Sequence, residues 1–141
     1  MDDARGSAPR EPGRHATVRE CVRPAVTTVE LNAHLAAAAY LMRRAGDTAV
    51  VVTTDDERRR PIGVVTDTDI AQAVADGRDV NEVRIDEIVG PEPVTTQPET
   101  AVSEATALML SAGIRHLPVV EDGHFVGIFD IAEACRALLD P

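Results

Sequence analysis

The most informative stretch of this chain is Gly63-Val64-Val65-Thr66-Asp67-Thr68-Asp69-Ile70. It predicts a β-strand that runs directly into the first turn of a helix, with Thr66 as the N-cap and Asp69 three residues later. Two interpretations of this corner are open. In the first, Thr66 and Asp69 form a capping box that satisfies free N–H groups at the helix start. In the second, the corner binds an anion and a ribose, because helix N-termini attract phosphate and a carboxylate accepts hydrogen bonds from hydroxyl groups.

A second copy of this corner indicates an internal repeat. Gly127-Ile128-Phe129-Asp130-Ile131-Ala132-Glu133 has the same glycine, two apolar residues and an acidic residue in the last place. The preceding helices match at one offset (113 − 46 = 67), and the glycines of the corners at a shorter one (127 − 63 = 64), which places the deletion in a hairpin. Each half is marginal alone, so we expect the two halves to pack together. The pairs at the first offset are Leu35 with Val102, Ala38 with Ala105, Leu41-Met42 with Leu108-Met109, and Gly46 with Gly113.

Composition excludes several classes of function. The chain has 141 residues and a net charge of -10, which argues against nucleic acid and against anionic membrane surfaces. No apolar run approaches the roughly 18 residues of a membrane span, and residues 1–14 show no apolar segment of a secretory signal. Cys21 and Cys135 are far apart and form no CxxC motif. We therefore expect a cytoplasmic protein without a metal or redox centre.

The order of the predicted elements gives an α/β fold of the α+β type, with β-α-β-β-α in each repeat. We expect a disordered tail at residues 1–16, the first repeat at 17–80 and the second at 81–141. Apolar periodicity and the positions of Gly and Pro set the bounds of the elements. Helical segments are predicted at 17–22, 31–45, 67–75, 83–89, 102–112 and 130–139, and extended segments at 25–29, 48–54, 61–65, 94–96, 115–120 and 125–129.

Two stretches and the repeated order of elements resemble the CBS domain. The stretches are the Gly63–Asp69 corner and Gly113-Ile114-Arg115-His116-Leu117-Pro118-Val119-Val120. The resemblance covers residues 17–140 and so is to a tandem CBS pair. It implies that the repeats pack sheet to sheet about a pseudo-twofold axis, with two symmetric clefts. It also implies regulation rather than catalysis, a homodimer of two pairs, and binding of an adenosine-containing ligand such as AMP, ADP, ATP or S-adenosylmethionine.

The resemblance also assigns ligand contacts in the first cleft. The family uses a Ser or Thr for phosphate and an Asp three residues later for ribose, and Thr66 and Asp69 match both positions. The opposite wall would contain Val94 and Ile114 of the second repeat, with Arg115 beside them as a cation for phosphate. Many stand-alone pairs carry an arginine where this chain has Thr68. The absence of that cation, together with the net acidity, favours AMP or a nucleoside-like ligand over ATP.

The second corner departs from the family pattern. Asp130 stands at the hydroxyl position and Glu133 at the ribose position. A carboxylate about 4 Å from a phosphate costs roughly 4 kcal/mol at an effective dielectric constant near 20. We therefore expect a capping box at the second corner and ligand binding in one cleft only.

The remaining polar residues have plainer interpretations. His116 either points into the cleft toward a phosphate or makes a structural hydrogen bond, and both remain open. We expect His34 and His124 at the surface, and the basic run at residues 58–60 in a solvated loop, with contact to an acidic partner as the alternative. Cys135 is expected to face inward as an inert thiol.

Three functional hypotheses follow. The first is a regulatory module that senses an adenosine-type ligand and signals through its dimer or an unidentified protein partner. The second is a structural or interaction dimer with empty clefts. The third, an enzyme, is the weakest, because the sequence shows no nucleophile–base pair and no set of metal ligands.

Overall fold

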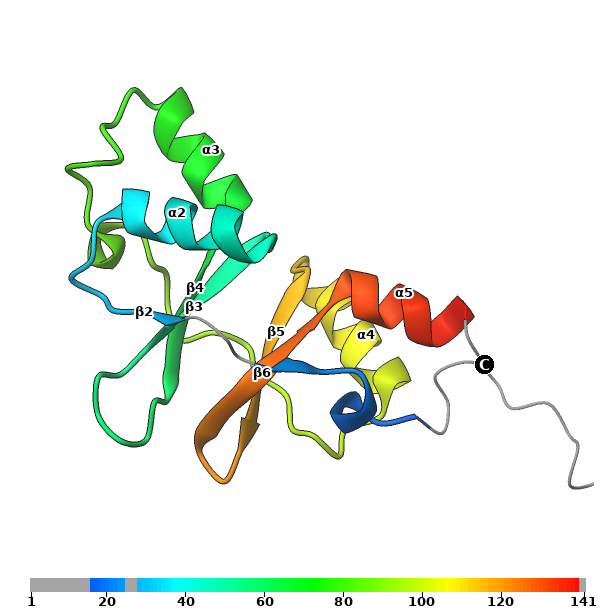
Figure 1. Ribbon diagram of the computed structural model, residues 1–141. Coiled ribbons are helices and arrows are strands. Elements are labelled where there is room, and N and C mark those ends of the chain that lie inside the picture. Colours follow the sequence, from blue (N-terminus) through cyan, green and yellow to red (C-terminus); the bar gives the residue numbers. More distant parts are fainter. Residues whose placement is uncertain (1–15, 25–27, 140–141) are drawn as a thin grey trace, which may run out of the picture.

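The chain folds into two halves, each with a small sheet and a pair of helices (Figure 1). The computed structural model describes residues 16–24 and 28–139, so the predicted tail at 1–16 lies outside it except for Ala16. In chain order the elements are η1 (Val18–Glu20), β1 (Arg23–Pro24), β2 (Thr28–Val29), α2 (Leu35–Ala45), β3 (Ala49–Thr53), β4 (Pro61–Thr66), α3 (Asp67–Ala75), η2 (Ile85–Glu87), α4 (Val102–Ala112), β5 (His116–Glu121), β6 (His124–Asp130) and α5 (Ile131–Leu139), where η is a 3-10 helix.

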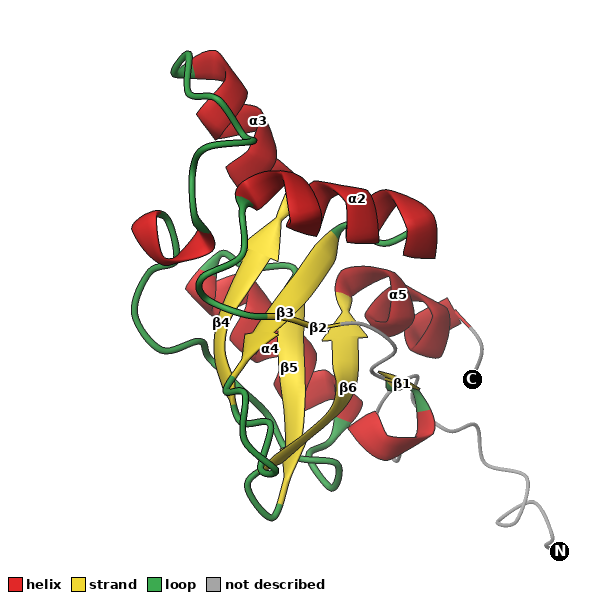
Figure 2. Cartoon of the chain, turned by 60° about the vertical axis from the view of Figure 1, so that its left-hand side comes forward, coloured by secondary structure: helices red, strands yellow, loops and turns green. Residues whose placement is uncertain are grey.

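Both sheets are built on an antiparallel hairpin. One sheet has the strand order β2-β3-β4 and the other β1-β6-β5. Val51 lies opposite Val64 in the first hairpin, and Pro118 lies opposite Ile128 in the second. Figure 2 shows the strands in the middle of the molecule, with α2 and α3 over one sheet and α4 and α5 over the other. The predicted α+β fold with two tandem repeats is therefore confirmed.

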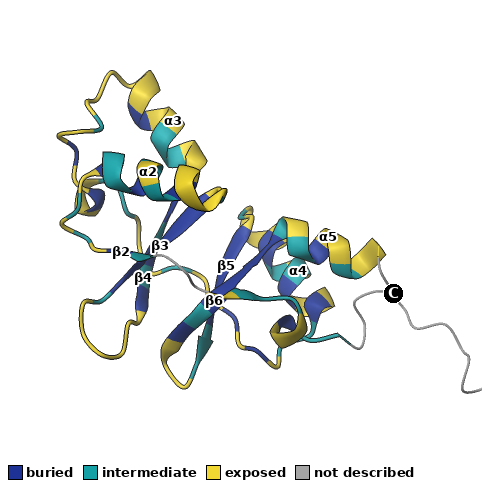
Figure 3. Ribbon diagram, viewed as in Figure 1, coloured by how far each residue is buried: buried dark blue, intermediate teal, exposed yellow. Residues whose placement is uncertain are grey.

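The two sheets pack against each other through a small apolar cluster. Val51 of β3 contacts Phe125 and Ile128 of β6, with Val64 partly buried beside them. The neighbouring residues Val50 and Val52 point the other way, into the core under α2 and α3. Every residue of β3 is buried, which agrees with its continuous apolar sequence (Figure 3). The predicted sheet-to-sheet packing is thus confirmed.

The two halves exchange the segments that lead into them. Residues 17–22 pack on the second half, where Val18 is fully buried in the core beneath α4 and α5. Residues 84–89 pack on the first half, where Ile85 is fully buried beneath α2 and α3. Val18 and Ile85 are related by the repeat offset (85 − 18 = 67). We call residues 17–22 and 84–89 the lead-in segments; in Figure 1 the blue one lies with the second half and the light-green one with the first.

Two glycines of the repeat allow these lead-in segments to come close. A Cβ atom at Gly63 would lie 2.5 Å from Cγ1 of Val89, and a Cβ at Gly127 would lie 2.2 Å from the backbone oxygen of Arg23. Cβ atoms do not approach other heavy atoms this closely. Glycine recurs at both corners because each lead-in segment crosses a strand there without room for a side chain.

Several predicted elements are shorter than the sequence indicated. The helical segments predicted at 17–22 and 83–89 are the three-residue helices η1 and η2, and residues 25–27 of the extended segment predicted at 25–29 lie outside the described residues. The helix predicted at 31–45 begins at Leu35. The carbonyl groups of Leu31 and Ala33 before it accept hydrogen bonds from the backbone N–H groups of Asp86 and Ile85 in the lead-in segment 84–89. The extended segment predicted at 94–96 is reduced to one bridge, between Thr96 and Val119. At the start of α2, a tertiary contact therefore overrides the local helical pattern.

The expectation that Cys135 faces inward is wrong. Cys135 is exposed, whereas its neighbour Ala134 is buried in the core. Successive residues of an α-helix are rotated by about 100°, since there are 3.6 residues per turn. The buried side of α5 therefore passes through Ile131, Ala134 and Ala137 and leaves the thiol on the solvent side.

Within residues 16–24 and 28–139, the structure contains no helix that is both long and apolar enough to cross a membrane.

The close contact at Gly127 predicts the effect of adding one methyl group. Gly127→Ala should lower the free energy of unfolding by about 1–3 kcal/mol, because the new Cβ meets a backbone atom that cannot rotate away. Gly63→Ala should cost less, since it meets the flexible side chain of Val89. Urea unfolding of each variant measures these differences.

Gly90→Ala is the matched control. A Cβ at Gly90 has no atom within 4 Å, so this variant should stay within about 0.5 kcal/mol of the parent protein. A loss in Gly127→Ala no larger than that in Gly90→Ala would contradict the close approach of the lead-in segment.

Candidate functional site

The first corner, where β4 meets α3, has the geometry of a capping box. The Thr66 backbone N–H donates to Asp69 Oδ2 at 2.8 Å, and the Asp69 N–H donates to Thr66 Oγ1 at 3.3 Å. The Thr66 hydroxyl also donates to Asp69 Oδ2, at 3.2 Å. Both halves of the predicted capping box are therefore present.

The capping box uses only one of the two carboxylate oxygens of Asp69. All the recorded hydrogen bonds of this carboxylate are to Oδ2, and none of the described residues donates to Oδ1. Asp69 is only partly buried. The carboxylate can therefore hold the helix start with one oxygen and accept a hydrogen bond from a ligand with the other, so the two interpretations of this corner are compatible.

A pocket of about 420 Å³ opens at this corner, between the two halves of the chain; we call it the first pocket. It contains all six residues that the sequence proposed as ligand contacts, from β4 and α3 on one side and from the second half on the other. These six are Thr66, Asp69, Val94, Ile114, Arg115 and His116.

The wall opposite Asp69 comes from two short segments of the second half. One is Gly90-Pro91-Glu92-Pro93-Val94, which follows the lead-in segment, and the other is Gly113 to His116, between α4 and β5. Gly113 ends α4 in the left-handed conformation, with φ of 69°, and so directs the chain into the pocket. Sequence reasoning named only Val94 in the first segment, although its two prolines were a signal of a rigid, extended wall.

Asp67 is a charged residue at this corner to which the sequence analysis gave no role. Its Oδ1 accepts from the backbone N–H of Thr68 at 2.8 Å and from Arg115 Nη2 at 3.3 Å. The ion pair joins the two halves of the chain, but about half of each side chain is exposed to solvent. The cation proposed for a phosphate is therefore already paired with a carboxylate.

His116 makes the structural hydrogen bond that was one of its two interpretations. It is buried, and its Nε2 lies 2.8 Å from the hydroxyl of Thr48 in the first half. Burial lowers the pKa of His116 below its ordinary value, and the Asp130 carboxylate opposes this shift. The ring also forms part of the first pocket, so the structural bond does not remove it from the site.

The second corner, where β6 meets α5, is occupied by Arg23. Its Nη2 donates to Asp130 Oδ2 at 2.7 Å, its Nη1 donates to Asp47, and its Nε lies 4.0 Å from Glu133 Oε2. Asp130 caps α5 by accepting from the Glu133 N–H at 2.9 Å. The Glu133 carboxylate pairs with Arg136 and lies near Arg23. We call Arg23, Asp47, Asp130 and Glu133 the arginine cluster.

Different residues at equivalent positions of the two repeats explain why the two corners differ. Arg23 corresponds to Gly90 (90 − 23 = 67), and Asp47 corresponds to Ile114 (114 − 47 = 67). At the first corner the glycine and isoleucine line a pocket, whereas the arginine and aspartate at the equivalent positions of the second corner form an ion pair. Sequence reasoning found the acidic pair at the second corner but not the arginine that neutralises it.

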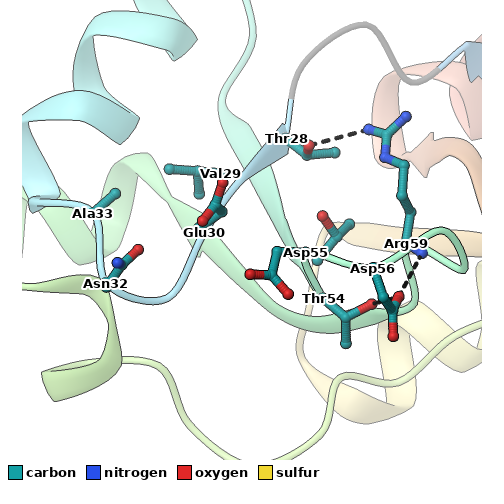
Figure 4. A pocket seen from close by; sticks show the side chains of 10 residues that line it. Thr28, Val29, Glu30, Asn32, Ala33, Thr54, Asp55, Asp56 and Arg59 are labelled. Carbon is teal, nitrogen blue, oxygen red and sulfur yellow. Dashed lines mark hydrogen bonds between the residues drawn. The ribbon is translucent and has the colours of Figure 1, made fainter.

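A further pocket, of about 510 Å³, lies along the β3–β4 loop away from both corners (Figure 4). Arg59 of the basic run donates to the Thr28 hydroxyl at 3.0 Å, and its backbone N–H donates to Asp56. The run thus helps to order this exposed loop. None of the proposed ligand contacts lies in this pocket. Within the described part of the chain, no group of three or more His, Cys, Asp or Glu is placed to hold a metal ion.

Comparisons with known proteins agree with this architecture. The CBS domain model matches residues 18–76 and 85–140. The CBS domain-containing protein YhcV of Bacillus subtilis is 30% identical over 119 residues, covering 84% of this chain and 82% of YhcV. An uncharacterized protein of Methanopyrus kandleri is 37% identical over 70 residues, covering 48% of this chain but only 36% of that protein. The chain thus spans about a third of the length of this second relative.

A solved structure shows the same arrangement of the two halves. A CBS domain protein from Pyrobaculum aerophilum, complexed with AMP, is 28% identical and superimposes with a TM-score of 0.79. The match covers 87% of this chain and 95% of that one.

The arginine cluster predicts a loss of stability on removal of its cation. Breaking a fully buried ion pair costs about 3–5 kcal/mol. Because the Arg23 side chain is 33% exposed, we expect Arg23→Ala to lower the free energy of unfolding by about 2 kcal/mol. Urea unfolding at low salt measures the loss.

Arg19→Ala is the matched control for this prediction. Arg19 pairs with Glu99 and Glu121, but its side chain is 53% exposed, so its removal should cost clearly less than the removal of Arg23. Similar losses in the two variants would show that the arginine cluster does not stabilise the second corner.

The buried His116 predicts a pH dependence of stability. Above its ordinary pKa of 6.5, His116 is neutral in both the folded and the unfolded chain. As the pH falls through 6.5, the unfolded chain binds a proton at this residue before the folded protein does, so the free energy of unfolding decreases. The decrease from this group stops below the lowered pKa of the folded state.

Unfolding measured near pH 7.5 and near pH 5.5 tests this dependence. His116→Gln should lose less stability between the two pH values than the parent protein. His124→Gln, in the solvated hairpin, should lose as much as the parent. An equal decrease in all three proteins would assign the pH dependence to other groups.

Proposed function

The chain belongs to the CBS domain family, as a tandem pair of these domains, and from this premise we propose that it is a regulatory module that binds an adenosine-type ligand in the first pocket. The observation that supports this most is the convergence of six proposed ligand contacts, from both halves, on one pocket. In this proposal the Oδ1 atom of Asp69 accepts from the ribose, and the hydroxyl of Thr66 turns from Asp69 Oδ2 to donate to a phosphate.

The opposite wall supplies the contacts for an adenine ring. Val94 is 40% exposed and Ile114 is partly buried, and both line the first pocket. Apolar side chains at the mouth of a pocket gain free energy when a flat ring covers them. The AMP complex of the Pyrobaculum aerophilum relative supports a ligand of this class.

We favour AMP over ATP and S-adenosylmethionine as the ligand. Thr66 at the start of α3 suits one phosphate. Arg115, the one Lys or Arg among the described residues that line the first pocket, shares this lining with the carboxylates of Asp69 and Glu92. A triphosphate would bring additional negative charge into this acidic surrounding, at a Coulombic cost.

Ligand binding can act on the arrangement of the two halves. Because the first pocket is built from both halves, a ligand that contacts both walls favours the arrangement in which the walls are close. The proposed output passes through a homodimer or a protein partner rather than through catalysis. Large apolar side chains exposed on the helices, including Tyr40, Leu110 and Leu139, are available for such contacts.

The arginine cluster favours an alternative, in which the protein is a structural or interaction module without a ligand. The ion pair between Arg23 and Asp130 already connects the chain at the second corner, so part of the interface between the halves needs no ligand. Ligand binding distinguishes the two functions.

Calorimetric titration with AMP, ATP and S-adenosylmethionine tests the proposal. We expect AMP to bind at about one site per chain and more tightly than the other two. Asp69→Ala should weaken AMP binding by about 1.5–3 kcal/mol, the value of a hydrogen bond to a charged group. Because Asp69 also caps α3, thermal unfolding of the variant should be measured in parallel.

Glu133→Gln is the matched control, since Glu133 occupies the position equivalent to Asp69 at the second corner. It should leave AMP binding unchanged. If none of the three ligands binds the parent protein, the alternative function stands. If Glu133→Gln weakens binding as much as Asp69→Ala, the ligand is not specific to the first pocket.

A further inference from the structure

Asp67 accepts hydrogen bonds from two residues that line the first pocket. Its Oδ1 accepts from the Thr68 N–H at 2.8 Å and from Arg115 Nη2 at 3.3 Å. Thr68 and Arg115 both line the pocket. A backbone N–H and a guanidinium group are the kinds of donor that hold a phosphate oxygen, so Asp67 is bonded to two groups that a phosphate could otherwise use.

The charges around this contact oppose an anionic ligand. Asp69 and Glu92 line the first pocket, and Asp67 lies against its Arg115. A phosphate near Arg115 would therefore meet the negative charge of Asp67 in addition to the two carboxylates of the lining. Each further phosphate increases this repulsion, whereas an uncharged nucleoside is not affected by it.

We propose that Asp67 sets the number of phosphates that the first pocket accepts, by holding Thr68 N–H and Arg115 in competition with the ligand. This inference rests on the proposed function, because it concerns the same pocket. Asp67 thereby discriminates among adenosine, AMP and ATP without contributing to the binding of the nucleoside part. A phosphate contacts these two donors only when it displaces the carboxylate, and a triphosphate binds more weakly than a single phosphate.

The test compares three ligands that differ only in phosphate number. Adenosine, AMP and ATP are titrated calorimetrically into the parent protein and into Asp67→Asn. The asparagine oxygen can still accept from Thr68 N–H, so the start of α3 is preserved, but the negative charge is removed. We expect AMP and ATP to bind at least about tenfold more tightly to the variant, which corresponds to about 1.4 kcal/mol, and adenosine to change less than about twofold.

Two further variants separate this effect from a general change of charge. Asp76→Asn removes one carboxylate at the other end of α3 and should change the affinity for none of the three ligands. In the double variant Asp67→Asn/Arg115→Gln, the gain for AMP should be smaller than in Asp67→Asn, because the guanidinium released from Asp67 is no longer present. Thermal unfolding of each variant verifies that it is folded.

The outcomes distinguish this inference from the proposed function. Tighter binding of AMP and ATP to Asp67→Asn, with adenosine unchanged, supports the inference. Adenosine binding with no gain for the phosphorylated ligands, or with an equal gain for all three, overturns it and leaves the proposed function in place. If no protein binds any of the three ligands, the proposed function fails and this inference fails with it.

Discussion

The close approach of the two lead-in segments to Gly63 and Gly127 is the constraint on which the rest of the structure depends. Each half completes its core with an apolar residue from the other, Val18 in one direction and Ile85 in the other. Neither half buries its apolar surface alone, and the crossing segments fix how the sheets face each other. The same crossing also builds the corners. The chain that passes Gly63 continues as one wall of the first pocket, and the chain that passes Gly127 delivers Arg23 to the second corner.

Charge then makes the two corners different although their backbone is repeated. At the first corner the residue after the crossing is Gly90, and a pocket remains. At the second corner it is Arg23, whose guanidinium group is held by Asp47 and Asp130. Two carboxylates near one another in a partly buried place are costly without a cation, so the acidic second corner and its arginine are mutually dependent. Among the described residues, one corner therefore opens into a pocket and the other carries an ion-pair cluster.

Predictions from the sequence were correct where the local sequence pattern and the tertiary contacts favour the same structure. The capping box at Thr66 depends on residues three apart, so it could be recognised directly. The ends of α2 and α4 at Gly46 and Gly113 were likewise local, because both positions require the left-handed conformation that glycine adopts readily. The inward placement of Cys135 failed because the buried side of α5 passes through Ile131, Ala134 and Ala137, and the residue after Ala134 is rotated by about 100° from it. The start of α2 at Leu35 was missed because the preceding carbonyl groups bond to a segment about fifty residues away.

The amino-acid sequence by itself determined the repeat and the capping pattern of Thr66 and Asp69, because these follow from residue identity and spacing along the chain. The resemblance to the CBS domain then indicated the ligand contacts that meet in the first pocket. Only the tertiary structure decided the exchange of the lead-in segments, the arginine at the second corner and the contact of Asp67 with Arg115. Arg23 and Asp130 lie 107 residues apart in sequence, and Asp67 and Arg115 lie 48 apart. Spacing along the chain carries no information about such pairs until the packing of the sheets brings them within the few ångströms over which hydrogen bonds and ion pairs act.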